Sequence, residues 1–220
     1  MITLPRPSAR TLLLVLVAVV VVGALAGGGW YWLSVQQSRT TAAYADALVR
    51  AQAGRRPQST PEARTAAARE LEGVLQRYPS APMAPQAAYE LASIRYAERQ
   101  YGAARAAYEI AASPSAPTTV RTLARLGIAY TWEAERNYSK AIEAFQAALA
   151  SSTSSDFMFE EVLYDLGVAQ ELAGRKDDAI KTYRRILKDV ARTRRSEEVR
   201  ARLASLGVTP DEPPAPSASR

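Results

Sequence analysis

Residues 160–190 (EEVLYDLGVAQELAGRKDDAIKTYRRILKDV) restrict the fold of this chain more than any other stretch. Apolar or small side chains recur there at steps of three and four, first over residues 163–173 and then over residues 179–187. Such spacing puts these side chains on one side of an α-helix. Gly174 separates the two runs, and glycine is typical of a helix end. The stretch therefore predicts two amphipathic helices joined by a tight turn.

Two small residues in this stretch indicate how the helices pack. Gly167 lies within the first helix and Ala179 near the start of the second. A glycine inside a helix normally costs about 0.5–1 kcal/mol relative to alanine. It is tolerated where a small residue lets two helices approach closely. We therefore expect the two helices to be in close contact at Gly167 and Ala179.

Looser copies of this unit precede it. Residues 85–112 and 120–150 repeat the pattern, and residues 36–78 form a degenerate first copy. The small residue of the first helix and the alanine of the second recur at fixed places, namely Ala92, Gly127 and Gly167 in the first and Ala67, Ala104, Ala141 and Ala179 in the second. The third copy holds two extra residues within TWEAERN, which we expect to lengthen its turn without changing either helix face.

This pattern resembles the tetratricopeptide repeat. The residues that carry the resemblance are Leu166-Gly167, Ala169, Ala179 and Tyr183, which match the Leu-Gly, small, alanine and aromatic positions of that repeat. The resemblance implies an all-α fold, an α-solenoid of helix pairs. It also implies a surface that holds other proteins or peptides.

The predicted repeat domain spans residues 36–207 and ends in a closing helix. Ser196 is placed to cap this helix, and Leu203 and Leu206 are spaced to face inward. Such a helix would cover the apolar face of the last repeat. Residues 208–220 are rich in proline and lack apolar periodicity, so we expect them to be disordered.

An apolar stretch precedes the repeats. Residues 11–35 carry no charged side chain. As a helix they would span about 37 Å, against about 30 Å for the hydrocarbon core of a bilayer. The sequence Trp30-Tyr31-Trp32 stands near the end of the stretch, where aromatic rings favour the headgroup boundary. The stretch therefore predicts a transmembrane anchor.

The orientation of this anchor follows from the charges beside it. Arg6 and Arg10 lie in the short basic segment 1–10, and basic residues favour the cytoplasmic side. The N-terminus is therefore predicted in the cytoplasm and the repeats on the other side. The alternative is a signal peptide cleaved after Ala26, because Ala24-Leu25-Ala26 fits an A-x-A site.

The layout of anchor and repeats resembles one bacterial family, the ancillary subunit of the Sec translocon. A basic N-terminus, one span ending in Trp-Tyr-Trp and a following repeat domain carry this resemblance. It implies an inner-membrane scaffold with periplasmic repeats, acting in a membrane complex that assists protein translocation or folding. Residues 77–96 instead resemble periplasmic repeat proteins of cell-envelope assembly. The alternative function is therefore a cleaved, soluble periplasmic regulator of an envelope machine.

Catalytic chemistry has little support in the composition. The chain contains no cysteine and no histidine, which excludes thiolate or imidazole metal sites and Cys-His or Ser-His catalytic pairs. The carboxylates are scattered, and no glycine-rich phosphate loop is present. We therefore expect no enzyme, no catalytic residue, no metal or cofactor, and no small-molecule substrate.

The resemblance to tetratricopeptide repeats also selects candidate binding residues. In that family the first helix of each pair lines a concave groove. Counted from the Leu-Gly position of each copy, the groove candidates are Gln86, Tyr89, Ser93, Tyr96, Arg121, Ile128, Thr131, Trp132, Glu161, Tyr164, Val168 and Glu171. The aromatic members are each interpreted as packing residues or, as a set, as anchors for a partner.

A second candidate surface is basic and consists of Arg184, Arg185, Lys188, Arg192, Arg194 and Arg195. The whole chain has a formal net charge of only +6. Interleaved aromatic residues, which nucleic-acid surfaces use, are missing here, so we expect no nucleic acid. The cluster is interpreted as a solvated surface, or as a patch for an acidic partner or anionic lipid.

Overall fold

The computed structural model describes residues 23–24, 27–28, 31, 35, 38–52, 59–150, 152–153, 156, 158–190 and 193–209. Within these residues the regular structure is entirely helical, as expected. A first helix covers residues 38–52. The later helices are α2 (Pro61–Arg77), α3 (Ala84–Ala97), α4 (Tyr101–Ala111), α5 (Thr118–Ala134), α6 (Tyr138–Leu149), α7 (Phe159–Leu172), α8 (Lys176–Asp189) and α9 (Ser196–Ser205).

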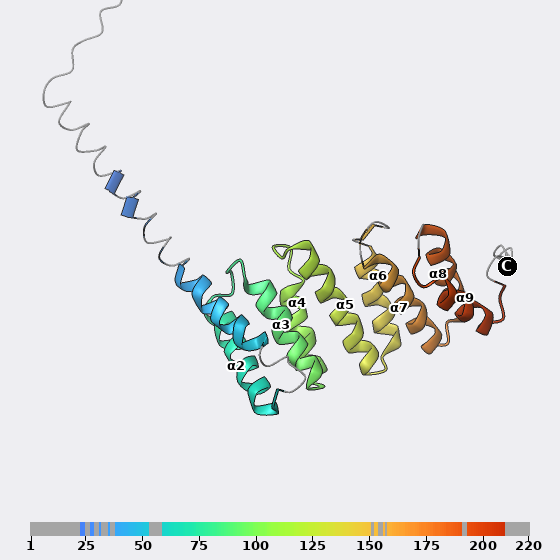
Figure 1. Cartoon of the computed structure of the whole chain (residues 1–220), viewed down its shortest axis with the longest axis horizontal. Helices are drawn as coiled ribbons and strands as arrows, with labels where there is room; N and C mark the ends of the chain where they lie inside the picture. The colour runs from blue at the N-terminus through green and yellow to red at the C-terminus, as the bar shows by residue number, and fades with distance from the viewer. Residues whose placement is uncertain are drawn as a thin grey trace, which may run out of the picture.

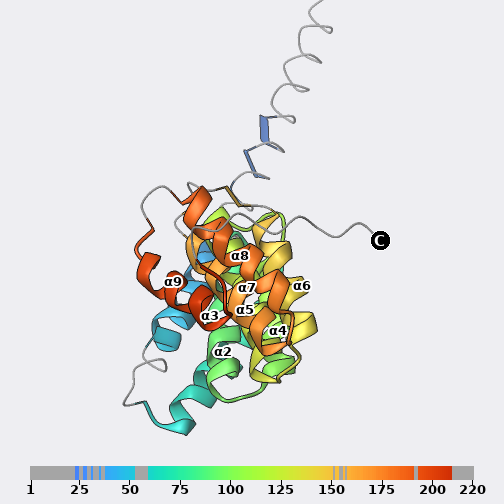
Figure 2. The same ribbon diagram turned by 90° about the vertical axis from the view of Figure 1, so that its right-hand side faces the viewer.

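The helices form an elongated row of antiparallel pairs (Figure 1). We call the helix over residues 38–52, α3, α5 and α7 the A helices, and α2, α4, α6 and α8 the B helices. Each helix from α2 onward packs against the next, and α3 also contacts α5. Figure 2 looks along the row and shows the pairs stacked behind one another. This arrangement is an α-solenoid, in which each pair buries its apolar face against its neighbours.

Local sequence explains where these helices form and end. In α8 the buried Ala179, Tyr183 and Ile186 recur every three or four residues, which gives one apolar stripe. The start of α2 has Pro61 as its first residue, and the Oγ1 of Thr60 accepts a hydrogen bond from the Ala63 N–H at 3.3 Å. Both features favour a helix N-terminus.

The three A-to-B turns from α3 onward share one geometry. Arg99, Arg136 and Gly174 have φ values of 60°, 58° and 73°. The N–H of the next residue bonds to a carbonyl five residues earlier, as from Arg175 to Gln170 at 2.8 Å. This is the Schellman arrangement that commonly ends helices. Each turn therefore has the same length, and α4, α6 and α8 each start two residues after the residue with positive φ.

The equal turns correct one prediction. The two extra residues of the third repeat do not lengthen its turn; they lie within α5, which spans Thr118–Ala134. Counted back from the turn, Ala129 and not Gly127 corresponds to Gly167. Gly127 is accordingly close to Tyr108 of the preceding repeat, where an added Cβ would lie 2.4 Å from the ring.

Gly167 itself confirms the expected close approach within the fourth repeat. A Cβ built there would lie 2.5 Å from Cε1 of Tyr183 in α8. The space is therefore taken by the ring of Tyr183, while Ala179 is buried nearby with none of its surface exposed. Gly167 is required because its missing side chain leaves room for an aromatic ring.

The expected closing helix is present as α9, but its start differs from the prediction. Ser196 is the first helical residue and does not cap the helix. The Glu160 carboxylate of α7 instead accepts hydrogen bonds from the Arg195 N–H at 3.1 Å and the Thr193 hydroxyl at 2.6 Å. Val199 and Leu203 of α9 are fully buried. The closing helix is therefore held by both apolar packing and a carboxylate.

None of the helices in the described part of the chain is both long enough and apolar enough to cross a membrane. The predicted anchor, residues 11–35, lies almost entirely outside the described residues, and so do the basic segment 1–10 and residues 210–220 of the predicted tail.

Candidate protein-binding surface

The groove candidates of α3 lie at or near the surface. Gln86 is exposed, and Tyr89, Ser93 and Tyr96 are partly buried. The ring of Tyr89 is 5.7 Å from that of Tyr108, centroid to centroid. The ring of Tyr96 is 5.5 Å from that of Tyr101, in an edge-on arrangement. These tyrosines therefore pack on one side and remain accessible on the other.

The candidates of α5 are mostly displaced from the groove. Thr131 has none of its surface exposed, and its hydroxyl donates to the Ile128 carbonyl at 2.6 Å. Ile128 packs against the apolar core, and Arg121 donates to the Pro114 carbonyl at 3.2 Å. The prediction of Thr131 as a surface contact is wrong, because the two additional residues inside α5 turn it inward.

Trp132 is displaced for the same reason. Its ring lies between two cations of the B helices: the guanidinium carbon of Arg105 in α4 is 3.6 Å from the ring centroid and the Nζ of Lys140 in α6 is 4.3 Å away. Arg105 is also paired with Glu135 at 2.7 Å. Trp132 thus joins successive B helices, and its ring is engaged by contacts within the chain.

The candidates of α7 are largely covered by α9. Tyr164 is only 6% exposed, and its hydroxyl donates to the Glu198 carboxylate at 2.5 Å. Glu161 pairs with Arg195 at 2.6 Å, and Val168 packs against the core. The prediction of Tyr164 as a free groove residue is wrong, because the closing helix occupies this part of the surface.

Glu171 is also engaged within the protein. Its carboxylate accepts a hydrogen bond from the Tyr183 hydroxyl and lies 3.5 Å from a guanidinium nitrogen of Arg202. Burial raises the pKa of the Tyr183 hydroxyl above its usual value, and the hydrogen bond to Glu171 raises it further. Glu171 therefore links α7, α8 and α9.

A pocket that the sequence did not indicate opens between α5 and α7. It has a volume of about 400 Å³, and we call it the tyrosine–carboxylate pocket. Its lining residues are Tyr96, Tyr130, Glu133, Ala134, Arg136, Tyr138, Asp165 and Leu172. The Tyr130 hydroxyl donates to the Asp165 carboxylate at 2.5 Å, which joins α5 to α7.

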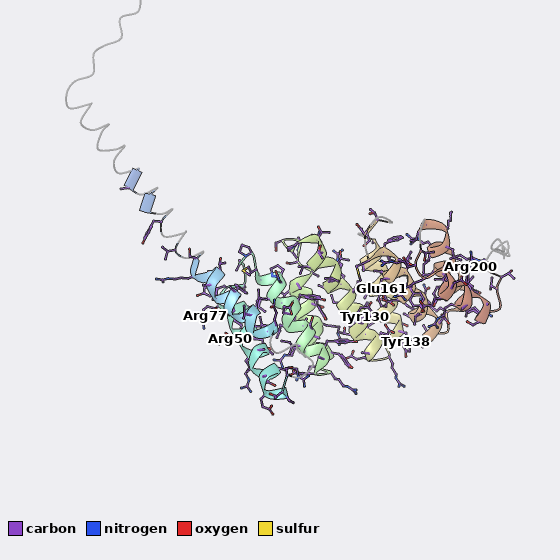
Figure 3. The ribbon with its side chains drawn as sticks, in the orientation of Figure 1. Arg50, Arg77, Tyr130, Tyr138, Glu161 and Arg200 are labelled. Atoms are coloured by element: carbon purple, nitrogen blue, oxygen red, sulfur yellow. The ribbon has the colours of Figure 1, made fainter. Side chains whose placement is uncertain are left out.

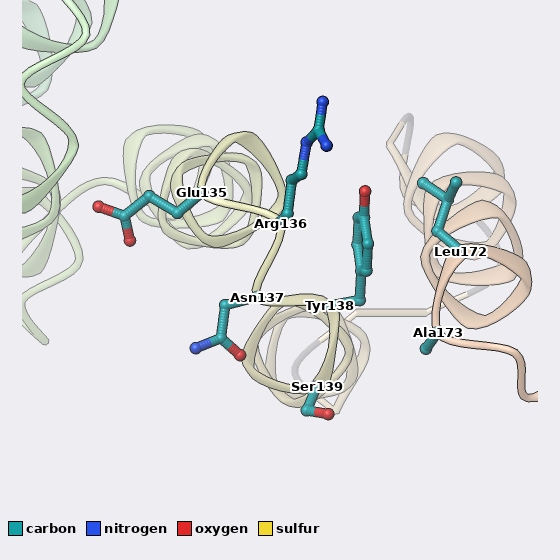
Figure 4. Close-up of a pocket in the computed structure, with 7 residues that line it drawn as sticks. All are labelled: Glu135, Arg136, Asn137, Tyr138, Ser139, Leu172 and Ala173. Atoms are coloured by element: carbon teal, nitrogen blue, oxygen red, sulfur yellow. The ribbon is translucent and has the colours of Figure 1, made fainter.

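A second pocket of about 530 Å³ adjoins the first along the A-to-B turns. Figure 4 shows Tyr138 between Arg136 and Leu172, three residues that line both pockets. Leu172 is 51% exposed. The two pockets therefore share a wall with an aromatic ring and an accessible apolar side chain.

Comparison with known families fixes the class of this fold. A protein-family model described as a tetratricopeptide repeat-like domain matches residues 9–208. The chain belongs to the tetratricopeptide repeat-like family. No curated protein matches the chain. Tetratricopeptide repeats are scaffolds for protein–protein interactions, and the class of function expected from the sequence is thereby supported.

The repeat alignment explains why the pocket residues were missed. Counted back from the shared A-to-B turns, Glu133 of the third tetratricopeptide-like repeat corresponds to Tyr96 of the second and Glu171 of the fourth. Tyr130 corresponds to Ser93 and Val168 in the same way. Tyr130 and Glu133 therefore stand at groove positions, two or fewer residues from the candidates chosen by the Leu-Gly motif.

The basic cluster is not a uniform free patch. Arg185 pairs with Asp189 at 3.1 Å, and Arg195 pairs with Glu161. Lys188 and Arg194 are exposed, whereas Arg184 is partly buried with its Nε inaccessible to solvent. A further member, Arg192, lies outside the described residues. Two of the cations therefore act within the repeat domain.

The two carboxyl groups of the pocket, Glu133 and Asp165, have raised pKa values. Burial raises the pKa of Asp165, and the nearby Glu161 carboxylate raises it further, although the Tyr130 hydrogen bond and the charge of Arg195 act in the opposite direction. Burial also raises the pKa of Glu133, with an added contribution from Asp165. No group of three or more His, Cys, Asp or Glu residues in the described part of the chain is arranged to hold a metal ion.

Glu133→Gln should raise the melting temperature at pH 7. A carboxylate whose pKa is raised by folding contributes stability below its ordinary pKa and loses that contribution as the pH rises through the folded value. The difference between the two proteins should therefore shrink as the pH falls toward 4.5, the ordinary value for glutamate. Thermal melts of the full chain in nonionic detergent from pH 4 to 8 measure it, with the exposed Glu143→Gln as the matched control. A lower melting temperature at pH 7 would contradict the prediction.

Proposed function

We propose that the chain is a membrane-anchored scaffold that holds exported or envelope proteins at the bacterial inner membrane. The observation that carries the proposal is the accessible A-helix surface of α3. Gln86 is exposed there, and Tyr89 and Tyr96 offer partly buried rings. Aromatic side chains of this kind anchor partners at little cost in side-chain entropy.

The anchoring part of the proposal rests on the sequence. Residues 11–35 are uncharged and apolar, and the family match from residue 9 to residue 208 covers this stretch together with the repeats. Arg6 and Arg10 precede it, which favours a cytoplasmic N-terminus and periplasmic repeats. In this arrangement the scaffold would hold its partners close to the membrane.

Site-specific photocrosslinking tests the binding surface. A photoreactive phenylalanine analogue placed at Gln86 on α3 should form crosslinks to a partner in membranes of cells that produce the full chain. The same analogue at Glu109, which is exposed on the B helix α4, is the control and should form few. Equal crosslinking from both positions, or crosslinking from Glu109 alone, would contradict binding on the A-helix surface.

The Ala24-Leu25-Ala26 sequence favours a second candidate, a soluble periplasmic regulator released by cleavage. The mass of the mature protein distinguishes the two. We expect an intact N-terminus and recovery in the membrane fraction after a high-salt wash. A mature chain that begins at Gly27 and fractionates with soluble protein would reject the anchor and leave the repeat scaffold in place.

A further inference from the structure

The fourth repeat shows what a tyrosine and its acidic neighbours can bind in this fold. There the Tyr164 hydroxyl donates to Glu198 of the following helix. The guanidinium of Arg195 lies 4.4 Å from the centroid of the Tyr164 ring. It also pairs with Glu161 at 2.6 Å and with Glu198 at 3.4 Å. One arginine of the chain thus meets an aromatic face and two carboxylates together.

The tyrosine–carboxylate pocket has the same kinds of group between α5 and α7, although at other positions of the repeat. The Tyr130 hydroxyl donates to Asp165 of the following A helix, as Tyr164 does to Glu198. Glu133 lines the pocket beside this pair. Its side chain forms no ion pair and no hydrogen bond within the described residues. Arg136 lines the pocket without forming an ion pair to either carboxylate. The charge of Arg195 acts on Asp165 from the side of α9, whereas Glu133 forms no ion pair in the part of the chain that the structure describes. The pocket therefore has one carboxylate, Glu133, whose charge no cation of these described residues pairs with.

The lining of the pocket suits a side chain with an apolar stem and a charged end. Tyr130 lies in the middle of the row of helices and Tyr138 at the start of the next B helix (Figure 3). With Tyr96 they give the pocket three aromatic side chains, and Leu172 adds an accessible apolar one at its rim. An aliphatic stem can pack on such rings while its charged end reaches the carboxylates.

We propose that the tyrosine–carboxylate pocket binds an arginine side chain of a protein partner, with the guanidinium held by Glu133 and Asp165. Arginine fits better than lysine, because its planar guanidinium stacks on aromatic rings and pairs with carboxylates through two parallel hydrogen bonds. The raised pKa of each carboxyl group agrees with this assignment, since a bound cation would offset the cost of burying their charges.

This inference rests on the proposed function and adds the chemistry of the partner. It places the partner's cationic side chain at the third and fourth repeats, where the A-helix surface ends against α9. The α3 surface with Gln86 and Tyr89 would bind an adjoining part of the same partner. The two regions can therefore be tested separately.

A matched pair of peptides tests the pocket. Fluorescein-labelled Gly-Leu-Arg-Ser-Gly amide is titrated with the full chain in nonionic detergent, and the same peptide with citrulline in place of arginine is the control. Citrulline has almost the same shape as arginine but no charge. We expect saturable binding of the arginine peptide and binding at least about tenfold weaker for citrulline, as loss of a charge pair typically causes. Fluorescence anisotropy is the measurement.

Variants of the two carboxylates complete the test. Glu133→Gln and Asp165→Asn should each weaken the arginine peptide by at least about tenfold, whereas Glu143→Gln on α6 should leave its affinity unchanged. Because Glu133→Gln is expected to raise the melting temperature, a loss of binding in that variant cannot be attributed to unfolding.

Three outcomes would overturn the assignment: no saturable binding of the arginine peptide, equal binding of both peptides, or unchanged affinity in Glu133→Gln. Crosslinking from residue 86 distinguishes this failure from that of the proposed function. If those crosslinks persist while the peptide does not bind, the scaffold stands and the arginine pocket is wrong. If the peptide binds as expected and the crosslinks are absent, the proposed surface on α3 is wrong.

Discussion

Replacing Gly167 with leucine should lower the free energy of unfolding by about 3 kcal/mol, the upper end of the usual cost of overpacking. The first atom of the new side chain would lie 2.5 Å from the Tyr183 ring. That ring is fully buried, and its hydroxyl donates to Glu171. Tyr183 therefore has to leave its place, with loss of both its packing and its hydrogen bond. Urea unfolding of the full chain in nonionic detergent, followed by circular dichroism, measures the change.

Gly73→Leu is the matched control for this experiment. Gly73 also lies within a helix, but no atom beyond its chain neighbours and the adjacent backbone of its own helix lies within 4 Å of a Cβ added there. The same substitution should therefore stabilise α2 by up to about 1 kcal/mol, the difference in helix propensity between glycine and leucine. Equal effects at the two positions would show that the contact between Gly167 and Tyr183 is absent.

Leu203→Ala in the closing helix is expected to cost about 2–5 kcal/mol, the range for truncating a buried leucine. Leu203 and Val199 are the two buried residues of α9, and Leu203 is fully enclosed. Loss of this packing should loosen α9 from α8 and uncover Tyr164. Hydrogen exchange should then increase over residues 193–209 before it increases in α3.

Leu206→Ala provides the comparison, because Leu206 follows α9 and is only partly buried. Its cost should be clearly smaller than that of Leu203→Ala. If the two variants unfold alike, the ion pairs of Arg195 and Arg202, and not the apolar packing, hold the closing helix. Melting at high salt separates these contributions, because ion pairs at the surface are screened and apolar packing is not.

The sequence was sufficient to predict the order and nearly the bounds of the helices. Periodic apolar positions are a local signal, and each repeat carries it twice. The run over residues 179–187, for example, was expected as a helix, and α8 spans Lys176–Asp189. Packing was also partly predictable, because a glycine inside a regular helix indicates a close neighbour. Only the three-dimensional structure identifies that neighbour as the ring of Tyr183.

The binding surface was less predictable, because a register error of two residues changes which side chains face a partner. The Leu-Gly motif of the third repeat pointed to Thr131 and Trp132. The additional residues lie inside α5, so the groove positions fall on Tyr130 and Glu133 instead. An acidic residue at Glu133 within an otherwise uncharged helix end was the available signal. The pocket also needs Asp165 from α7, a pairing that no local pattern reveals.

The shared A-to-B turn has a consequence for which side chains this position can carry. A left-handed backbone costs a residue with a side chain about 1–2 kcal/mol, and glycine avoids that cost. Gly174 occupies this position in one turn, but Arg99 and Arg136 occupy it in the two others. The stacked helices thus impose the turn even on an unfavourable residue, so this position accepts side chains of different kinds. Arg136 also lines the tyrosine–carboxylate pocket, so a substitution at this turn position can change the pocket while the solenoid is preserved.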